Sequence, residues 1–339
     1  VEQDYLGRWG HTTVVLSDDS IILLGGRIGS VPVGVSPYLS PNIWQSFDKG
    51  KTWIKISKAT WSARAEHTSV VLLDDSIVLI GGENTSGKLN DIWLSPDQGA
   101  NWIERAVAEW SARDGHTSVV LPDGSIVLMG GDDGDIRLND VWRSNDKGKT
   151  WVEMTSNAEW SGRYEHASVV LPDGNIVLMG GREYYTKNDV WRSTDQGATW
   201  HLMTEHADWS ARDGHTSVVL SDGSILLMGG GSSITDRNND VWRSEDQGAT
   251  WQLITENAEW SGRTDHTSVV LPDGSILLMG GGGNLNDVWH STNEGKNWIS
   301  MTEEAEWSER GCHASVVLSD GSVVLFGGVY QLGEIIYLN

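Results

Sequence analysis

The chain has 339 residues, with 47 acidic and 24 basic side chains, and its formal net charge is −23. This surplus of carboxylates argues against nucleic acid and anionic membranes as partners, because both are bound through basic residues. It is typical of a soluble protein, with a preference for a cationic partner as the alternative. The single cysteine, Cys312, excludes an intrachain disulfide, and no apolar run has membrane-spanning length, so we expect no membrane insertion.

A repeated unit of roughly 50 residues fills nearly the whole chain. Its first half occurs seven times and its second half six times. A chain of this length usually forms two or three domains. A periodic chain can instead form one closed architecture, so we predict that residues 1–339 form a single domain.

The third unit shows which elements the repeat contains. Four short strands are predicted from β-branched and apolar residues and from the turn residues between them. They cover His116–Leu121, Ser125–Met129, Asp140–Arg143 and Trp151–Met154. The second of them is continuously apolar, which favours burial on both faces.

Four antiparallel strands per unit and no helical period predict an all-β fold, a seven-bladed β-propeller of four-stranded blades. Closure into a ring removes the exposed sheet edges that an open stack would carry. Of the 19 tryptophans, 18 recur at three positions in six units, and only Trp9 lies outside this scheme. We expect these indoles to pack between blades.

The first and last units depart from the pattern. After Gly25-Gly26 the first unit has a long loop, Arg27–Pro41, with three prolines. This loop is either a partner surface or folded onto its own blade. The seventh unit has no second half after a predicted third strand, Glu334–Leu338. We expect Val1–Asp4 to lie near this strand and partly close the ring, with an incomplete, three-stranded last blade as the alternative.

At these residues the chain resembles two repeat families. The Gly-Gly pair followed by Asn-Asp-Val-Trp is similar to the kelch repeat, and Ser-x-Asp-x-Gly-x-Thr-Trp resembles the Asp-box, or BNR repeat. The second resemblance implies an aspartate in the hairpin between the third and fourth strands. Local chemistry agrees, since such a side chain can accept N–H groups of its own turn. Neither resemblance implies one particular activity.

An Arg-x-x-His motif precedes the first strand of every unit. Its arginines are candidates for a ring at one channel mouth that holds an anion or carboxylate. The alternative is that each Arg or His ties one blade to the next, and its presence in every unit favours this structural role. The arginines are Arg8, Arg64, Arg113, Arg163, Arg212, Arg263 and Arg310.

Partner recognition is expected where the units differ. In kelch propellers the Arg-x-x-His entries and the loops after each Gly-Gly share one face, so the resemblance implies that this face carries the site. Further ligand-binding candidates on it are Tyr38, Tyr164, Glu165, Arg182, Tyr184 and Tyr185. Other positions that vary between units are Trp9, Glu66, Asp265 and Cys312. The loop Asp132–Asp135 suggests Ca²⁺, but its spacing favours a solvated acidic loop, and we predict neither a metal nor a cofactor.

These features predict a non-catalytic binding or scaffold protein that recognises a protein or glycan, and we expect a monomer. A sialidase-like or sialic-acid-epimerase-like enzyme acting on an acidic sugar is the alternative, and a purely structural surface protein is a third. No catalytic residue is assigned. The start at Val1 rather than Met leaves signal-peptide removal and trimming open, and a secreted or cell-surface location is one expectation.

Overall fold

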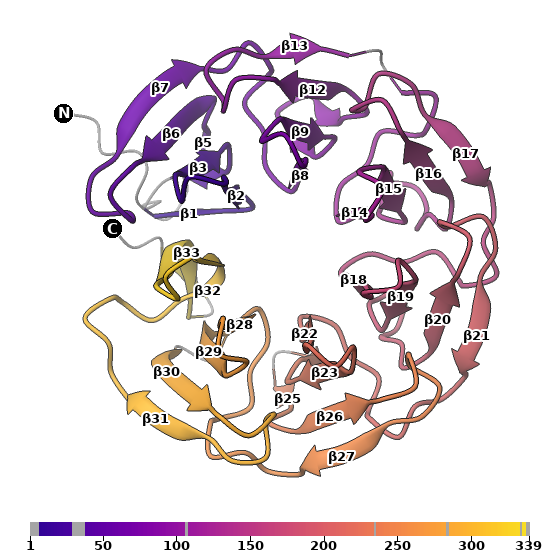
Figure 1. Cartoon of the computed structure of the whole chain (residues 1–339), viewed down its shortest axis with the longest axis vertical. Coiled ribbons are helices and arrows are strands. Elements are labelled where there is room, and N and C mark those ends of the chain that lie inside the picture. Colours follow the sequence, from indigo (N-terminus) through magenta and orange to yellow (C-terminus); the bar gives the residue numbers. More distant parts are fainter. Residues whose placement is uncertain are drawn as a thin grey trace.

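The computed structural model describes residues 7–28, 38–105, 108–233, 235–282, 285–332 and 334–336. All regular elements in this part of the chain are strands, and none of it forms a helix with the length and hydrophobicity needed to cross a bilayer. Six four-stranded antiparallel sheets and one three-stranded sheet are arranged in a ring (Figure 1). The predicted all-β propeller is therefore confirmed, and we number these sheets as blades one to seven in chain order.

The first strand of each blade lies nearest the centre. These strands are β2 (Thr12–Val15), β8 (Thr68–Val71), β14 (Thr117–Val120), β18 (Ala167–Val170), β22 (Thr216–Val219), β28 (Thr267–Val270) and β32 (Gly311–Val317). Each contacts the first strand of the next blade, and β32 contacts β2, which closes the ring (Figure 1). A central cavity of about 360 Å³ is lined by these strands from several blades.

The second strands are apolar and form the middle of each blade. They are β3 (Ile21–Leu24), β9 (Ile77–Ile80), β15 (Ile126–Met129), β19 (Ile176–Met179), β23 (Ile225–Met228), β29 (Ile276–Gly281) and β33 (Val323–Leu332). In β15 all four side chains are fully buried, because neighbouring blades cover both faces. The prediction from the continuous apolar run is confirmed.

Six blades continue with a third and a fourth strand. The third strands are β6 (Asn42–Ser46), β12 (Ile92–Ser95), β16 (Val141–Ser144), β20 (Val190–Ser193), β26 (Val241–Ser244) and β30 (Leu285–Ser291). The fourth strands are β7 (Ile54–Lys58), β13 (Ile103–Glu104), β17 (Val152–Thr155), β21 (His201–Thr204), β27 (Gln252–Thr255) and β31 (Ile299–Thr302). All pairs are antiparallel, as the turn residues predict.

The repeated tryptophans pack between blades, as predicted. Trp110 and Trp160 are only 2% and 1% exposed. Trp110 lies in one apolar cluster with side chains of blades two and three. Its ring meets Trp151 edge-on, with the centroids 6.4 Å apart. Because the same pair recurs around the ring, indoles hold the blades together.

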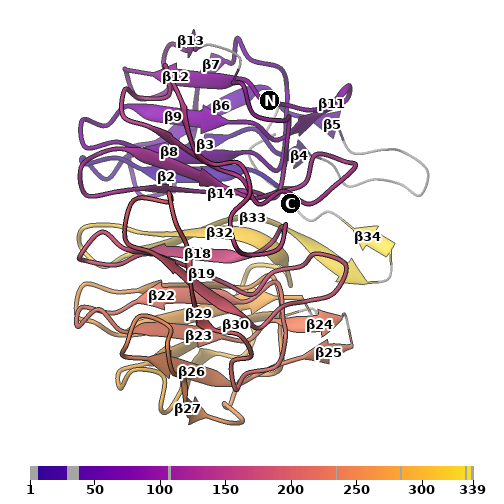
Figure 2. The same ribbon diagram turned by 90° about the vertical axis from the view of Figure 1, so that its right-hand side faces the viewer.

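Short additional strands gather on one face of the ring, toward the right of Figure 2. They are β1 (Arg8–Trp9), β4 (Arg27–Ile28), β5 (Tyr38–Leu39), β10 (Glu83–Asn84), β11 (Gly87–Lys88), β24 (Gly231–Ser233), β25 (Asp236–Arg237) and β34 (Glu334–Ile336). Most belong to the loops that follow the Gly-Gly pairs, so we call this side the loop face. The two ends of the long first loop pair with each other as β4 and β5, and β4 also pairs with β1. The middle of this loop lies outside the described residues.

Blade seven contains β32, β33 and β34, and β34 begins at the predicted Glu334. It pairs only with Tyr330–Leu332, at the far end of β33. Val1–Asp4, which we expected to lie near the last strand, fall outside the described residues. The strand β1, which follows them, does contact β32 and β33.

Candidate channel-mouth site

The repeated arginines are enclosed inside their own blades. Arg64 is fully buried, and its two terminal nitrogens donate to the two carboxylate oxygens of Asp91, both at 2.6 Å. It also donates to the carbonyl oxygen of Gly81, and its guanidinium lies 5.6 Å from the ring centre of Trp61. The same pairing joins Arg113 to Asp140, Arg163 to Asp189, Arg212 to Asp240 and Arg263 to Asp287.

The expectation of an arginine ring open to a ligand is therefore corrected. Six of the seven arginines have no exposed surface, and Arg8 is among them, with a hydrogen bond to the carbonyl oxygen of Gly25. In five of them a bidentate pair with a largely buried aspartate engages both terminal nitrogens and leaves no donor for an anion at the mouth. Five of the arginines tie the first strand to the second and third strands of the same blade. Arg310, in blade seven, is only half-buried and differs from the rest.

The histidines of the motif make the predicted connection between blades. Nε2 of His116 lies 2.9 Å from the hydroxyl oxygen of Thr68, on the first strand of the preceding blade. The equivalent bond recurs at His67, His166, His266 and His313. Burial, reinforced by the positive charge of the nearby arginine, lowers the pKa of His116 to about 3. The histidines are therefore neutral structural groups at physiological pH.

Two positions that vary from blade to blade lie between the Arg and the His of the motif, and the second of them directly precedes the His. It is occupied, in order, by Gly10, Glu66, Gly115, Glu165, Gly214, Asp265 and Cys312. All seven have a positive φ, between 52° and 62°, which is unusual for residues other than glycine. The ring therefore imposes one backbone shape here, while the side chain is free to change.

Acidic side chains alternate with glycine at this position in blades one to six. A Cβ at Gly10 would lie only 2.5 Å from Oε1 of Glu66, so glycine in one blade leaves room for the carboxylate of the next. The backbone N–H of Glu66 also donates to the carbonyl oxygen of Gly10. Asp265 lies over Gly214 in the same way. The alternation thus leaves space for the carboxylates of Glu66 and Asp265, while Gly115 leaves space for Tyr164 beside Glu165.

These three carboxylates influence one another across the mouth of the channel. Burial, with the negative charge of Asp114 next in size, raises the pKa of Glu66 to about 7. Partial desolvation, followed by the charges of Asp213 and Asp265, raises the pKa of Glu165 to about 7, although this side chain stays open to water. Burial also raises the pKa of Asp265. We call Glu66, Glu165 and Asp265 the acidic mouth.

Basic side chains from the loops bridge adjacent blades around the acidic mouth. Lys88 Nζ lies 2.8 Å from Asp114 and 2.7 Å from Asp132. Arg182 Nε lies 2.5 Å from Asp213. Arg27 of blade one pairs with Glu83 of blade two, whereas Arg137 pairs with Asp132 within blade three. The basic side chains of the loops are therefore paired with other carboxylates. Among the residues described, none of them forms an ion pair with the acidic mouth.

The aromatic candidates are divided between two environments. Tyr164 lies under Arg137, with the guanidinium 4.9 Å from its ring centre. Tyr184 and Tyr185 are each 84% exposed and Tyr38 is 58% exposed. Isolated bridges such as Tyr164–Arg182 place the entries and the loops on one face, as the resemblance implies.

The acidic loop of blade three is held by ion pairs and by its own turn. Asp132 pairs with Lys88 and Arg137. Asp133 Oδ1 accepts the N–H groups of Asp135 and Ile136. No group of three or more His, Cys, Asp or Glu side chains in the described ranges is arranged to hold a metal ion. The carboxylates of Asp132 and Asp133 thus have structural partners.

The sequence singled out Glu66, Glu165 and Asp265 as places where the units differ but did not predict that their charges influence one another. It missed Arg27, Lys88 and Arg137, which complete the loop face. Each of these three basic residues lies in the loop after a Gly-Gly pair. That shared location is the signal that could have identified them.

Comparison with known families agrees with this architecture. Residues 2–181 and residues 154–328 each match the family model described as the KLHDC2/KLHL20/DRC7 Kelch-repeats domain. No curated protein matches the chain. The two segments together cover nearly the whole ring of antiparallel sheets, and the chain therefore belongs to the kelch-repeat domain family.

Proposed function

We propose that residues 1–339 act as one non-catalytic protein-binding domain whose loop face recognises a positively charged segment of a partner protein. The observation that carries this proposal is the acidic mouth. Three carboxylates interact electrostatically there, while the six buried arginines are enclosed in their blades and expose no guanidinium to pair with them. A lysine or arginine entering the mouth would relieve the repulsion between these carboxylates and favour their ionised forms.

The aromatic side chains of blade four support the same proposal. Tyr184 and Tyr185 are exposed on the loop that also carries Arg182. A tyrosine ring attracts ammonium and guanidinium groups through its face, and aromatic residues are enriched at protein interfaces. The net charge of −23 adds long-range attraction for a basic partner.

An acidic sugar is a poorer fit to this surface. Recognition of its carboxylate needs an available arginine or lysine, and the motif arginines expected to supply it are buried or hydrogen-bonded. The carboxylates of the acidic mouth would repel such a ligand. We therefore favour a basic protein segment over an acidic sugar as the ligand of this surface.

Binding to a library of lysine- and arginine-containing peptides tests the proposal. We expect several of them to bind, more weakly at high salt, and about tenfold or more weakly to a Glu66→Gln/Glu165→Gln/Asp265→Asn variant. The matched control is Glu153→Gln/Glu205→Gln/Glu256→Gln, which removes the same charge at exposed positions. Equal binding by the two variants, or preference for acidic glycans, would refute the proposal.

A further inference from the structure

The three carboxylates of the acidic mouth differ in their access to solvent. Glu66 and Asp265 are half-buried, whereas Glu165 is exposed. All three directly precede the histidine of the motif, and all three have nearly the same backbone shape, with φ between 52° and 54°. The backbone at this position therefore does not explain why Glu165 alone is exposed.

In blades two and six the carboxylate covers the glycine of the preceding blade. A Cβ on Gly10 would lie 2.5 Å from Oε1 of Glu66, and a Cβ on Gly214 would lie 3.2 Å from Oδ1 of Asp265. The residue before the acid is small in both blades, an alanine in blade two and a threonine in blade six. A small residue therefore leaves the space over the glycine to the carboxylate.

In blade four a tyrosine takes this place. A Cβ on Gly115 would lie 3.1 Å from Cβ of Tyr164 and 3.7 Å from its ring, and Glu165 is not among the nearest neighbours. The guanidinium of Arg137 lies 4.9 Å from the centre of this ring, and two backbone hydrogen bonds join Tyr164 to Arg182. Because Tyr164 is held over Gly115, the side chain of Glu165 extends into solvent.

The basic side chains of the blade-four loop are paired with other acids. Arg182 Nε lies 2.5 Å from Asp213 of blade five, and Lys187 pairs with Glu183 at 2.7 Å. No residue outside the described ranges carries a basic side chain. Glu165 is thus an exposed carboxylate for which the described part of the chain supplies no ion-pair partner.

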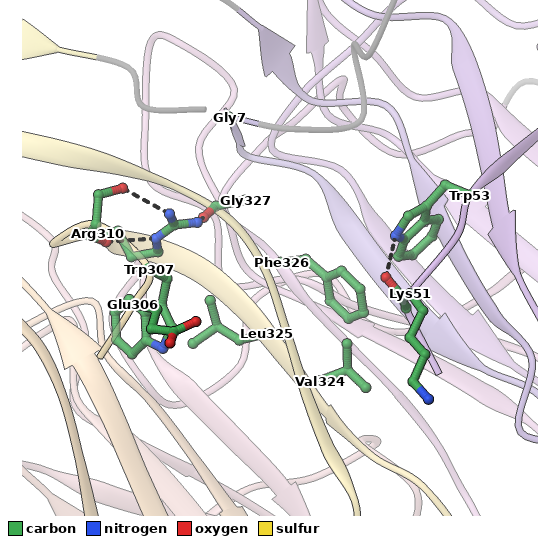
Figure 3. A pocket seen from close by; sticks show the side chains of 12 residues that line it. Gly7, Lys51, Trp53, Glu306, Trp307, Arg310, Val324, Leu325, Phe326 and Gly327 are labelled. Atoms are coloured by element: carbon green, nitrogen blue, oxygen red, sulfur yellow. Dashed lines mark hydrogen bonds between the residues drawn. The ribbon is translucent and has the colours of Figure 1, made fainter. Parts of the chain in front are cut away.

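The cavity between blades seven and one is a less suitable place for a basic segment. It has a volume of about 490 Å³, and Figure 3 shows apolar side chains such as Phe326 along it. Among the described side chains that line it, Lys51 and Arg310 are basic and Glu306 is the single acid. A further cation would meet charges of its own sign there.

We propose, building on the function proposed above, that Glu165 is the carboxylate that contacts the basic side chain of the partner, and that Tyr164 is its positioning residue. Glu66 and Asp265 act on the same cation through their charge, from a longer distance. Tyr164 acts by occupying the space over Gly115. With a smaller residue at position 164, the carboxylate of Glu165 would cover Gly115 as its counterparts cover their glycines.

Fluorescence anisotropy with a labelled Gly-Lys-Gly-Lys-Gly peptide at low salt tests the contact. Glu165→Gln should weaken binding about tenfold, nearly as much as the triple variant of the acidic mouth does. Glu66→Gln/Asp265→Asn removes two charges and should weaken binding only about twofold. A loss in this double variant as large as that in Glu165→Gln would overturn the inference and leave the proposed function standing. No binding by the unchanged protein would refute the proposed function and this inference with it.

Substitutions of Tyr164 test its positioning role without changing the charge. Tyr164→Thr introduces the residue found in blade six and should weaken binding of the same peptide about fivefold. Tyr164→Phe should restore binding, because the ring remains over Gly115. Unaltered binding by Tyr164→Thr would contradict the role of Tyr164.

Carbodiimide labelling of carboxyl groups, read by mass spectrometry, gives an answer from the unchanged protein. Glu165 should be labelled several times faster than Glu66, and the peptide should protect Glu165 but not the exposed Glu205. In Tyr164→Thr the labelling of Glu165 should slow toward the rate of Glu66. Equal labelling of Glu165 and Glu66 in the unchanged protein, or no protection of Glu165 by the bound peptide, would overturn the inference.

Discussion

Arg163 and His166 differ from Glu165 in environment although all three lie within four residues of the chain. Arg163 and His166 are buried, with partners inside their own blade or in the blade before it. Glu165 is exposed at the mouth and interacts electrostatically with acids of other blades. Positions that repeat in every unit hold the ring together, whereas Glu165 occupies a position that varies from unit to unit and that we propose faces a ligand. The following predictions test this difference, from the largest effect to the smallest.

Acidification should produce the largest loss of stability, because it acts on the histidine of every blade. Burial lowers the pKa of five of the seven histidines to about 3. Burial holds the pKa of the other two, His67 and His266, well below the usual value. Between about pH 6.5 and pH 3 the unfolded chain binds more protons than the folded one, so stability is complete above this window and falls through it.

Urea unfolding as a function of pH measures this loss. A His166→Gln variant should lose less stability between pH 7 and pH 4 than the unchanged protein does, whatever its stability at pH 7. An unchanged slope against pH would mean that His166 does not contribute through its protonation.

Removing a repeated arginine should cost far more than removing a loop arginine. Arg163→Ala leaves the carboxylate of Asp189 without its partner, and we expect a loss of about 3–5 kcal/mol in unfolding free energy. Arg182→Ala breaks a partly exposed pair with Asp213, and about 1 kcal/mol or less is expected. Chemical denaturation of the two variants provides the comparison. Similar losses of unfolding free energy would contradict the view that the repeated arginines stabilise the blades while the arginines of the loop face contribute little.

Turns between the third and fourth strands contribute a smaller, local effect. Asp146 Oδ1 accepts the N–H of Thr150 at 2.8 Å, and Oδ2 accepts its hydroxyl at 2.6 Å. This confirms the predicted role of the aspartate within its own turn. We expect Asp146→Ala to cost about 1 kcal/mol, measured by thermal unfolding.

Blade six supplies the control for this turn. Asn293 occupies the position of the aspartate and accepts the N–H of Asn297 at 3.0 Å. Asp146→Asn should therefore be nearly neutral. A loss as large as that of the alanine variant would show that charge, rather than the accepted hydrogen bond, stabilises the turn.

The acidic mouth should respond with a small effect of opposite sign. Because the pKa of Glu66 is raised to about 7, the folded state holds its proton more tightly than the unfolded state. The stability due to this group is complete below about pH 4.5 and falls as the pH rises to about 7. Glu66→Gln should therefore stabilise the ring slightly at pH 8 and leave it unchanged at pH 4, as melting temperatures can show. Destabilisation at pH 8 would contradict an unpaired carboxylate in the mouth.

Prediction from the sequence succeeded for features that residues within a single unit determine, namely the strands and the buried tryptophans. The four strands of unit three were placed within about one residue, since turn residues and apolar runs mark them locally. Buried indoles were predictable because a large aromatic at the same position in six units has few other roles. The arginines were harder to interpret. Arg163 meets Asp189 at the start of the third strand, and spacing alone does not show whether such a side chain points into the blade or into the channel.

The sequence by itself determined a closed ring of small antiparallel sheets, because the repeat period, the turns and the tryptophans are properties of every unit. Only the tertiary structure decided that six of the arginines are enclosed, that three distant carboxylates share one mouth, and that Arg310 has no carboxylate partner among the described residues. These outcomes depend on which side chains meet after the ring closes. Repulsion between these carboxylates depends on side chains from different blades. The sequence of a single unit therefore does not predict it.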